Sequence, residues 1–332
     1  MKLLFAKSAG SFLSWFYTEF WIMKKSSVPV FSARMGLFYS ITSAVAYAML
    51  PVFTRMSLAS GMSSLEIMQL RYGFGVAMVF IYLAICSPQS LKITPKGLFI
   101  AFILSFGLDQ VTSLNLARCF ETLTASTGIL IFYIFPAITT LLSVLINKTP
   151  VSGKTIASIV LIAGGCCLVL IQAFSNRVEL SGVLYVLSAA FTFALSFVIL
   201  QRVMETIPPL TITFYVMLFT TLGFNLVKGD ISLFLQLDSY QLLMGFLLGL
   251  IPTALGVTLL YLAIDATDSG FAALCSSIEP AVTVLAAYLI LSEPVLLVQI
   301  AGMLIVMLGI FIKYLDSNYT KESSVTCLKK CA

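Results

Sequence analysis

Ile278-Glu279-Pro280-Ala281 opens the stretch of sequence that decides the fold. The apolar run around this acid and proline ends at Leu291, reverses at Ser292-Glu293-Pro294, and returns through a second apolar run to about Lys313. The same pattern occurs 144 positions earlier without a gap, with 11 identities over the 30 positions 136–165. About three identities would be expected by chance at this composition. The identical residues of the earlier copy are Pro136, Ala137, Thr139, Leu141, Leu145, Ile146, Pro150, Val151, Ile156, Ala157 and Gly165. The chain therefore contains an internal duplication.

The duplication extends upstream to five helical spans in each copy. Gly36, Tyr39 and Ala48 recur as Gly182, Tyr185 and Ala194 at an offset of 146 positions. At the same offset, Leu114, Leu116 and Ala117 recur as Leu260, Leu262 and Ala263. We expect ten spans, at roughly 35–57, 64–86, 97–118, 122–146, 151–173, 179–201, 209–228, 241–263, 268–291 and 295–315. Because five is odd, the second copy enters the membrane from the opposite side, which gives inverted repeats.

The composition is that of a membrane protein. Hydrophobic residues make up 60% of the chain and charged residues 10%, whereas a soluble domain carries about 25% charged residues. Apolar runs of about 20 residues are long enough to cross a ~30 Å hydrocarbon core. The predicted fold is an all-α polytopic membrane protein with one repeat at 35–173 and the other at 179–316.

Several kinds of chemistry are excluded by what the sequence lacks. Histidine is absent, which removes Ser-His-Asp and Cys-His catalysis and HExxH metal sites. The seven cysteines show no CxxC spacing and are expected to pack as small apolar residues. The net charge of +5 is spread along the loops without a basic stripe. We therefore expect no cofactor, no metal and no nucleic-acid partner. A GxxxG motif at Gly245 and Gly249 indicates close helix packing in a monomer or weak homodimer.

The two ends of the chain are expected on the cytoplasmic side of the cell (inner) membrane. Residues 1–34 read as an amphipathic segment suited to the membrane interface, although translation could instead begin at Met23 or Met35. Residues 317–332 form a tail. With a cytoplasmic amino terminus, 14 basic residues fall on that side and four on the other, which satisfies the positive-inside rule.

Helix breaks point to a binding site within the bundle. Pro136 and Pro280 occupy equivalent positions of the two copies, and Pro252 interrupts another span. A proline inside a span frees a backbone carbonyl, which a membrane tolerates where protein or a water-filled cavity satisfies it. We expect these three prolines to act in gating; kinking for packing alone is the alternative.

Polar stripes on the first, third, fourth, sixth, eighth and ninth spans predict one central pathway. A charge at mid-membrane costs roughly 2.5–3.5 kcal/mol and should face a cavity or a partner, so Glu279 and Asp109 are candidate coupling or recognition residues. Arg71 is expected either to pair with an acid as a structural ion pair or to reach outward to the interface. Two acids with at most one base favour protons, amines, zwitterions or cations as ligands. The other candidate binding residues are Tyr47, Tyr133, Tyr185, Tyr261, Ser43, Ser276 and Thr192.

The two hairpins resemble the EamA domains of the drug/metabolite transporter superfamily. In that family a mid-helix proline is followed by a Gly-Glu-Pro-like turn and a Gln-x-x-Gly helix, which Leu291-Ser292-Glu293-Pro294 and Gln299-Ile300-Ala301-Gly302 match closely. The first copy departs, with Lys148-Thr149-Pro150 in the turn and Thr155 in place of the glutamine. The resemblance covers about 35–316. It implies ten helices in inverted five-helix repeats, a central cavity and alternating access.

The expected function is secondary transport, as exporter or exchanger, of a small organic metabolite with amine or cationic character. Amino acids and S-adenosylmethionine are examples that the resemblance implies, and protons are a candidate coupling ion. The expected partners are this small-molecule substrate and the lipid bilayer. A membrane receptor or scaffold, or a membrane-embedded enzyme, remains the alternative.

Overall fold

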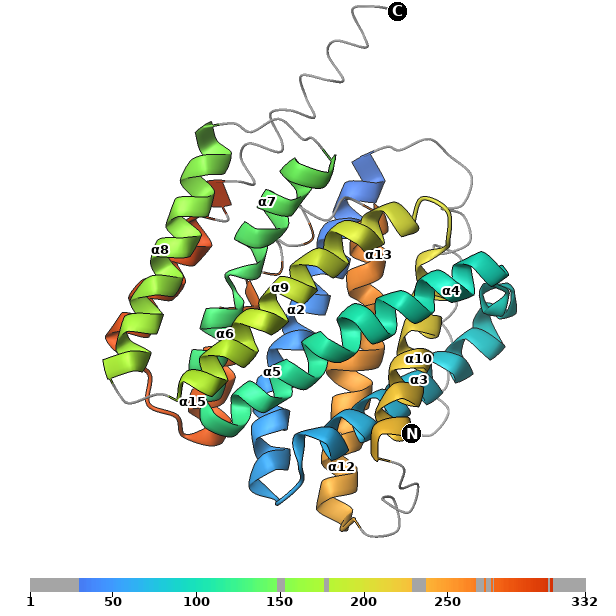
Figure 1. The fold of residues 1–332 in the computed structure, drawn as a ribbon, viewed down its shortest axis with the longest axis horizontal. Helices are drawn as coiled ribbons and strands as arrows, with labels where there is room; N and C mark the ends of the chain where they lie inside the picture. Colours follow the sequence, from blue (N-terminus) through green and yellow to red (C-terminus); the bar gives the residue numbers. More distant parts are fainter. Residues whose placement is uncertain are drawn as a thin grey trace, which may run out of the picture.

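A computed structural model describes residues 30–147, 153–175, 179–228, 237–266, 272, 276, 278–309 and 311–312. Most of the predicted interfacial segment 1–34, and all of the tail 317–332, lie outside the described residues. Within the described ranges the chain is helical, and no strand occurs among them (Figure 1).

The helices follow one another in the order that the repeats predict. The first half contains α2 (Val30–Ala59), α3 (Ser64–Cys86), η2 (Pro88–Leu91), α4 (Pro95–Leu104), η3 (Ser105–Asp109), α5 (Gln110–Thr122), α6 (Ala125–Phe132), α7 (Phe135–Asn147) and α8 (Gly153–Ser175). The second half contains α9 (Leu180–Val203), α10 (Pro209–Lys228), α12 (Ser239–Leu248), η4 (Gly249–Val257), α13 (Thr258–Ala266) and α15 (Ile278–Leu291), followed by a helix at Leu297–Gly309.

The helices have the length and apolarity of a multi-pass membrane protein. Among the described residues, six helices are long and apolar enough to cross a bilayer, at Met35–Ala59, Ser64–Cys86, Pro95–Thr122, Leu180–Val203, Pro209–Val227 and Ser239–Ala266. Four shorter apolar helices are Ala125–Thr139, Ile156–Gly165, Ile278–Leu291 and Leu297–Gly309. Large apolar side chains such as Ile85, Leu226 and Leu297 are exposed on the outside of the bundle, as expected for a surface solvated by lipid.

Helix starts follow ordinary capping rules. A side-chain oxygen accepts a hydrogen bond from a backbone N–H in the first turn of α3, α4, α6 and α12, which satisfies one of the donors that a helix start leaves free. The capping residues are Ser63, Thr94, Thr124 and Asp238. In α3 and α12 the side chain of the third helical residue also accepts from the capping residue, which completes a capping box.

Two spans carry a π-helical segment at equivalent positions. η3 joins α4 to α5, and η4 joins α12 to α13. Adding the 146-residue offset to 105–109 gives 251–255, which lies inside η4. π-Helical turns widen the helix locally and are frequent at functional sites. The duplication has therefore placed the same irregularity in both halves of the chain.

The paired prolines stand at helix starts rather than in the middle of continuous helices. α6 ends at Phe132 and α7 begins at Phe135, so Pro136 is the second residue of α7. Pro280 is the third residue of α15. Proline is well tolerated in a first helical turn because its missing N–H has no partner there anyway.

The turn before the last helix ties the second repeat to the first. The buried carboxylate of Glu293 accepts hydrogen bonds from the backbone N–H groups of Ala125 and Ser126, at 3.0 and 3.2 Å, and from the Ser126 hydroxyl at 2.9 Å. Gln299 Nε2 donates to Thr127 Oγ1 at 3.1 Å. An acid at a helix N-terminus is favourable because it meets free N–H groups and the positive end of the helix dipole. The Glu-Pro turn therefore fixes where α6 begins.

Packing between the halves is reciprocal. α5 packs on α9, and in the same way α13 packs on α2. Glycines bring α8 against the last helix: a Cβ added at Gly165 would lie 2.7 Å from the carbonyl oxygen of Gly302, and one at Gly309 would lie 3.0 Å from that of Ser158. At the 144-residue offset, positions 158 and 165 correspond to 302 and 309. The two helices thus exchange equivalent contacts, and because 165 meets 302 while 158 meets 309, they run antiparallel.

The glycine contact between α8 and the last helix can be tested with neighbouring glycines. Gly165→Ala should lower the melting temperature of the purified protein, because its Cβ would press on backbone atoms that cannot move aside, at a cost of about 1–3 kcal/mol. Gly164→Ala is the control, since a Cβ at Gly164 meets nothing within 4 Å and alanine favours the helix. Equal melting temperatures for the two variants would contradict the contact.

Candidate functional site

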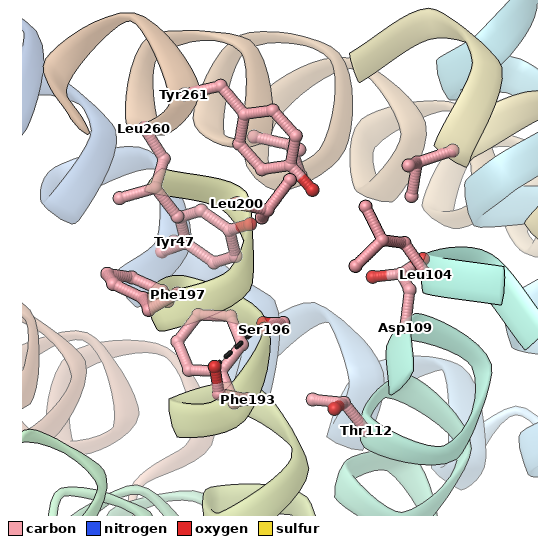
Figure 2. A pocket seen from close by; sticks show the side chains of 12 residues that line it. Tyr47, Leu104, Asp109, Thr112, Phe193, Ser196, Phe197, Leu200, Leu260 and Tyr261 are labelled. Carbon is pink, nitrogen blue, oxygen red and sulfur yellow. Dashed lines mark hydrogen bonds between the residues drawn. The ribbon is translucent and has the colours of Figure 1, made fainter. Parts of the chain in front are cut away.

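A cavity lies inside the bundle and is lined from both halves of the chain. Two adjoining hollows share Tyr47, Asp109, Thr112, Phe193, Phe197 and Leu260, so we treat them as one central cavity. In Figure 2 the hydroxyl of Tyr261 points into this space, and Asp109 and Thr112 border it from another helix. The remaining lining residues are Leu50, Arg71, Tyr72, Leu104, Ser113, Leu116, Phe132, Phe135, Ser196, Leu200, Val216, Val257, Tyr261, Ser276 and Glu279.

Two acidic side chains and one basic side chain line the cavity, and each is held by a hydroxyl from another helix. Thr220 of α10 donates to Asp109 Oδ2 at 2.8 Å. Tyr133, at the end of α6, donates toward Glu279 Oε2 at 3.0 Å. Arg71 Nε of α3 donates to Thr253 Oγ1 of η4 at 2.7 Å. Hydrogen bonds to charged groups contribute more than neutral ones, so these contacts fix where the charges lie.

The expected ion pair of Arg71 is not formed among the described residues. Its guanidinium donates to Thr253 and lies 5.0 Å from the centre of the Tyr72 ring, and no carboxylate in this part of the chain pairs with it. The side chain is 3% exposed, so it does not reach outward to the interface either. The reason is close packing of α3 on η4: a Cβ at Gly249 would lie 3.0 Å from the backbone nitrogen of Gly75. This contact turns Arg71 inward to Thr253.

Aromatic rings form much of the cavity wall. Phe193 and Phe197 of α9 have ring centres 4.8 Å apart, and Phe135 lies 5.0 Å from Phe193. Phe132 packs on Phe193 at 5.2 Å. Together with Tyr47 and Tyr261 these rings give a surface that can contact both apolar groups and cations.

The hydroxyls that hold the charges also satisfy backbone carbonyls next to the prolines. Next to Pro252, Thr253 Oγ1 donates to the Leu248 carbonyl at 2.8 Å, where the π-helical segment η4 begins. The Ser276 carbonyl, four residues before Pro280, accepts from the Tyr133 hydroxyl and from the Glu279 N–H. Ser43 Oγ donates to the Gly256 carbonyl in η4 at 2.8 Å. The helix breaks are therefore closed by side chains from within the bundle.

The structure brings together most, but not all, of the residues that the sequence singles out. Glu279, Asp109, Tyr47, Tyr261 and Ser276 line the cavity. Tyr133 and Ser43 do not line the cavity but form the hydrogen bonds just described. Thr192 is hydrogen-bonded to Thr112 at 2.6 Å and supports that lining residue. Tyr185 lies elsewhere, with Arg118 placed 5.7 Å from its ring centre.

The lining also includes helices that the polar stripes do not indicate. The six expected spans all contribute, but α3 adds Arg71 and Tyr72, and α10 adds Val216. The phenylalanines of the wall carry no sequence signal, since an aromatic residue at helical spacing is equally typical of helix packing. Among the described residues, no group of three or more Cys, Asp or Glu side chains could hold a metal ion.

Comparisons with known proteins identify the fold and the family. Residues 34–171 and 180–315 each match the model of the family described as EamA-like transporter family. A solved structure, titled only "Crystal structure of protein", has a TM-score of 0.65 to this chain at 13% sequence identity, and the alignment covers 84% of this chain and 96% of the other. At that identity the likeness shows the fold alone. No curated protein matches the chain in a sequence comparison.

The double role of Tyr133 can be tested by removing its hydroxyl. Tyr133→Phe should lower the melting temperature, because it removes the one hydroxyl hydrogen that the Ser276 carbonyl and the Glu279 carboxyl group share, at a cost of about 1–3 kcal/mol when a buried group loses its partner. Tyr185→Phe is the matched control, since it keeps the ring beside Arg118. If both variants melt at the wild-type temperature, the hydroxyl of Tyr133 does not support the site.

Proposed function

The chain belongs to the EamA-like transporter family, and from this premise we propose that it is a secondary transporter of a small organic metabolite bearing an amine or another cationic group. The observation that carries the proposal is the central cavity, which the carboxyl groups of Asp109 and Glu279 line together with a single guanidinium, that of Arg71. Amino acids and S-adenosylmethionine are solutes of this class. Protons are the proposed coupling ion, and no enzymatic activity is proposed.

The walls of the cavity suit a solute with a cationic group. A cation within about 6 Å of an aromatic face is attracted by the ring, and tyrosine and phenylalanine rings surround the two acids. Excess acid over base disfavours polyanions, because a second negative charge on the solute would meet Asp109 and Glu279 in a site removed from water. A small amine-bearing solute fits both features.

We propose the topology of ten spans in two inverted five-helix repeats, with both termini in the cytoplasm and the protein in the cell (inner) membrane. The antiparallel run of α8 and the last helix supports the inversion, since these are equivalent helices of the two copies. The equivalent π-helical segments support it as well. In such a pair of repeats, rocking of one half against the other gives alternating access to a central site. The breaks before Pro136 and Pro280, and the irregular helix around Pro252, are the proposed hinges.

A thermal-shift screen followed by transport assays tests the function. Purified protein should be stabilised by one or more amino acids, polyamines or S-adenosylmethionine, since a ligand that binds only the folded state raises its stability. The stabilising solute should then exchange across the membrane of proteoliposomes. Ligand-induced stabilisation without any solute flux would instead favour a receptor, and chemical conversion of the solute would favour an enzyme.

The role of Glu279 is tested by removing its charge. Glu279→Gln and Asp109→Asn should each lower the rate of solute exchange by about tenfold or more, the effect expected when a charge-assisted hydrogen bond to the solute is lost. Glu279→Gln should also flatten the dependence of the rate on pH. Asp265→Asn, at an exposed acid outside the cavity, is the control. A folded Glu279→Gln protein with the wild-type rate and pH profile would remove the proposed role of this acid.

A further inference from the structure

Arg71 is a buried cation that forms no direct ion pair with a carboxylate of the described residues. The side chain lines the central cavity and is 3% exposed. Removing a guanidinium from water is costly, and the cost is recovered only if good hydrogen bonds and an opposite charge replace the water. The protein supplies some of these hydrogen bonds but no paired opposite charge, and the unused donors indicate what the site binds.

The hydrogen bonds of Arg71 account for only a fraction of its donors. A guanidinium carries five N–H groups. Among the described residues, Nε donates to Thr253 Oγ1 at 2.7 Å, and the one other hydrogen bond runs from Nη1 to the Met68 sulfur at 3.9 Å. Sulfur is a weak acceptor, so the two terminal nitrogens remain available to a ligand.

The carboxylates of the cavity do not accept hydrogen bonds from these nitrogens. Asp109 Oδ2 accepts from Thr220, and Glu279 Oε2 accepts from Tyr133. Neither acid forms an ion pair with Arg71 in the described part of the chain. The cavity therefore presents one basic and two acidic groups that are each held by a separate hydrogen bond.

Arg71 is also held in place before any ligand arrives. The hydroxyl hydrogen of Thr253 goes to the Leu248 carbonyl, so its lone pair is left to accept from Nε of Arg71. A Cβ at Gly75 would lie 2.7 Å from Thr253 Cγ2, so α3 and η4 pack in direct contact beside this hydrogen bond. A fixed guanidinium loses little freedom when it binds, and this favours affinity.

We propose that Arg71 binds the carboxylate of the transported solute, so that the site selects zwitterions over simple amines. This inference rests on the proposed transport function and adds the anionic half of the substrate to it. The planar fork of a guanidinium matches a carboxylate with two parallel hydrogen bonds. The acids Asp109 and Glu279 then bind the ammonium group of the solute, and the aromatic rings of the cavity contact its side chain. A solute with two opposite charges then has a partner for its carboxylate in Arg71 and for its ammonium group in the two acids.

Matched ligands separate the carboxylate from the rest of the solute. The probes are L-phenylalanine, its methyl ester and 2-phenylethylamine, and a second set of L-lysine, its methyl ester and cadaverine. Apparent Kd values come from the concentration dependence of thermal stabilisation, and exchange in proteoliposomes provides the second measurement. Wild-type protein should bind the amino acid of at least one set about tenfold more tightly than its ester or amine, because only the amino acid offers a carboxylate to Arg71.

Variants of Arg71 assign that preference to one residue. Arg71→Gln should reduce the preference to within about twofold by weakening only the amino acid, and Arg71→Lys should keep part of it, since an ammonium attracts a carboxylate but lacks the fork. Arg118→Gln removes a cation beside Tyr185, away from the cavity, and should leave the preference unchanged.

The outcomes distinguish this inference from the proposed function. Wild-type protein that binds and exchanges esters or amines as well as amino acids would overturn the role of Arg71 while leaving amine transport intact. The same holds if a folded Arg71→Gln protein keeps the wild-type preference. If no amino acid, ester or amine binds or exchanges, the proposed function itself fails.

Discussion

A charge inside a bilayer must be compensated by a polar group of the protein or by water, because lipid tails offer no polar partner. In this bundle a hydroxyl from a different helix forms that hydrogen bond: Thr253 with Arg71, Thr220 with Asp109 and Tyr133 with Glu279. A hydroxyl fixes the position of a charge without cancelling it. The three groups therefore remain able to attract a charged solute, which an internal salt bridge would prevent.

The same constraint links the backbone to the site. Thr253 donates to the Leu248 carbonyl, four residues before Pro252, and Tyr133 donates to the Ser276 carbonyl, four residues before Pro280. One side chain thus closes a break in a helix and holds an ionisable group. Movement at the break would shift the hydroxyl and so change the surroundings of Arg71 or Glu279. This gives the proposed hinges a direct connection to the groups that would bind the solute.

The sequence was sufficient for the class of fold, since a duplication of long apolar runs is visible without any structure, and the two matches to the family confirm it. It also indicated the acids of the cavity, because a carboxyl group within an apolar run must face a cavity or a polar partner. Neither expectation for Arg71, an ion pair with an acid or a reach to the interface, is met among the described residues, and Tyr185 does not line the cavity in which it was expected. Both depend on how each helix is rotated and how closely it packs, which is decided by glycines such as Gly75 and Gly249 together with their neighbours. The phenylalanine wall was missed for the same reason: the spacing of Phe193 and Phe197 is equally suited to packing against another helix.

The central claim is that the charged groups border a space that water and solutes can enter. The most direct measurement is the reaction of a charged thiol reagent with single cysteines, introduced after the seven native cysteines have been replaced by serine. Ser196→Cys in the cavity should react, and a stabilising solute should protect it, whereas Leu184→Cys on the exposed apolar face of α9 should stay inert. If Ser196→Cys is as unreactive as Leu184→Cys in functional protein, the cavity is closed to water and the account is contradicted.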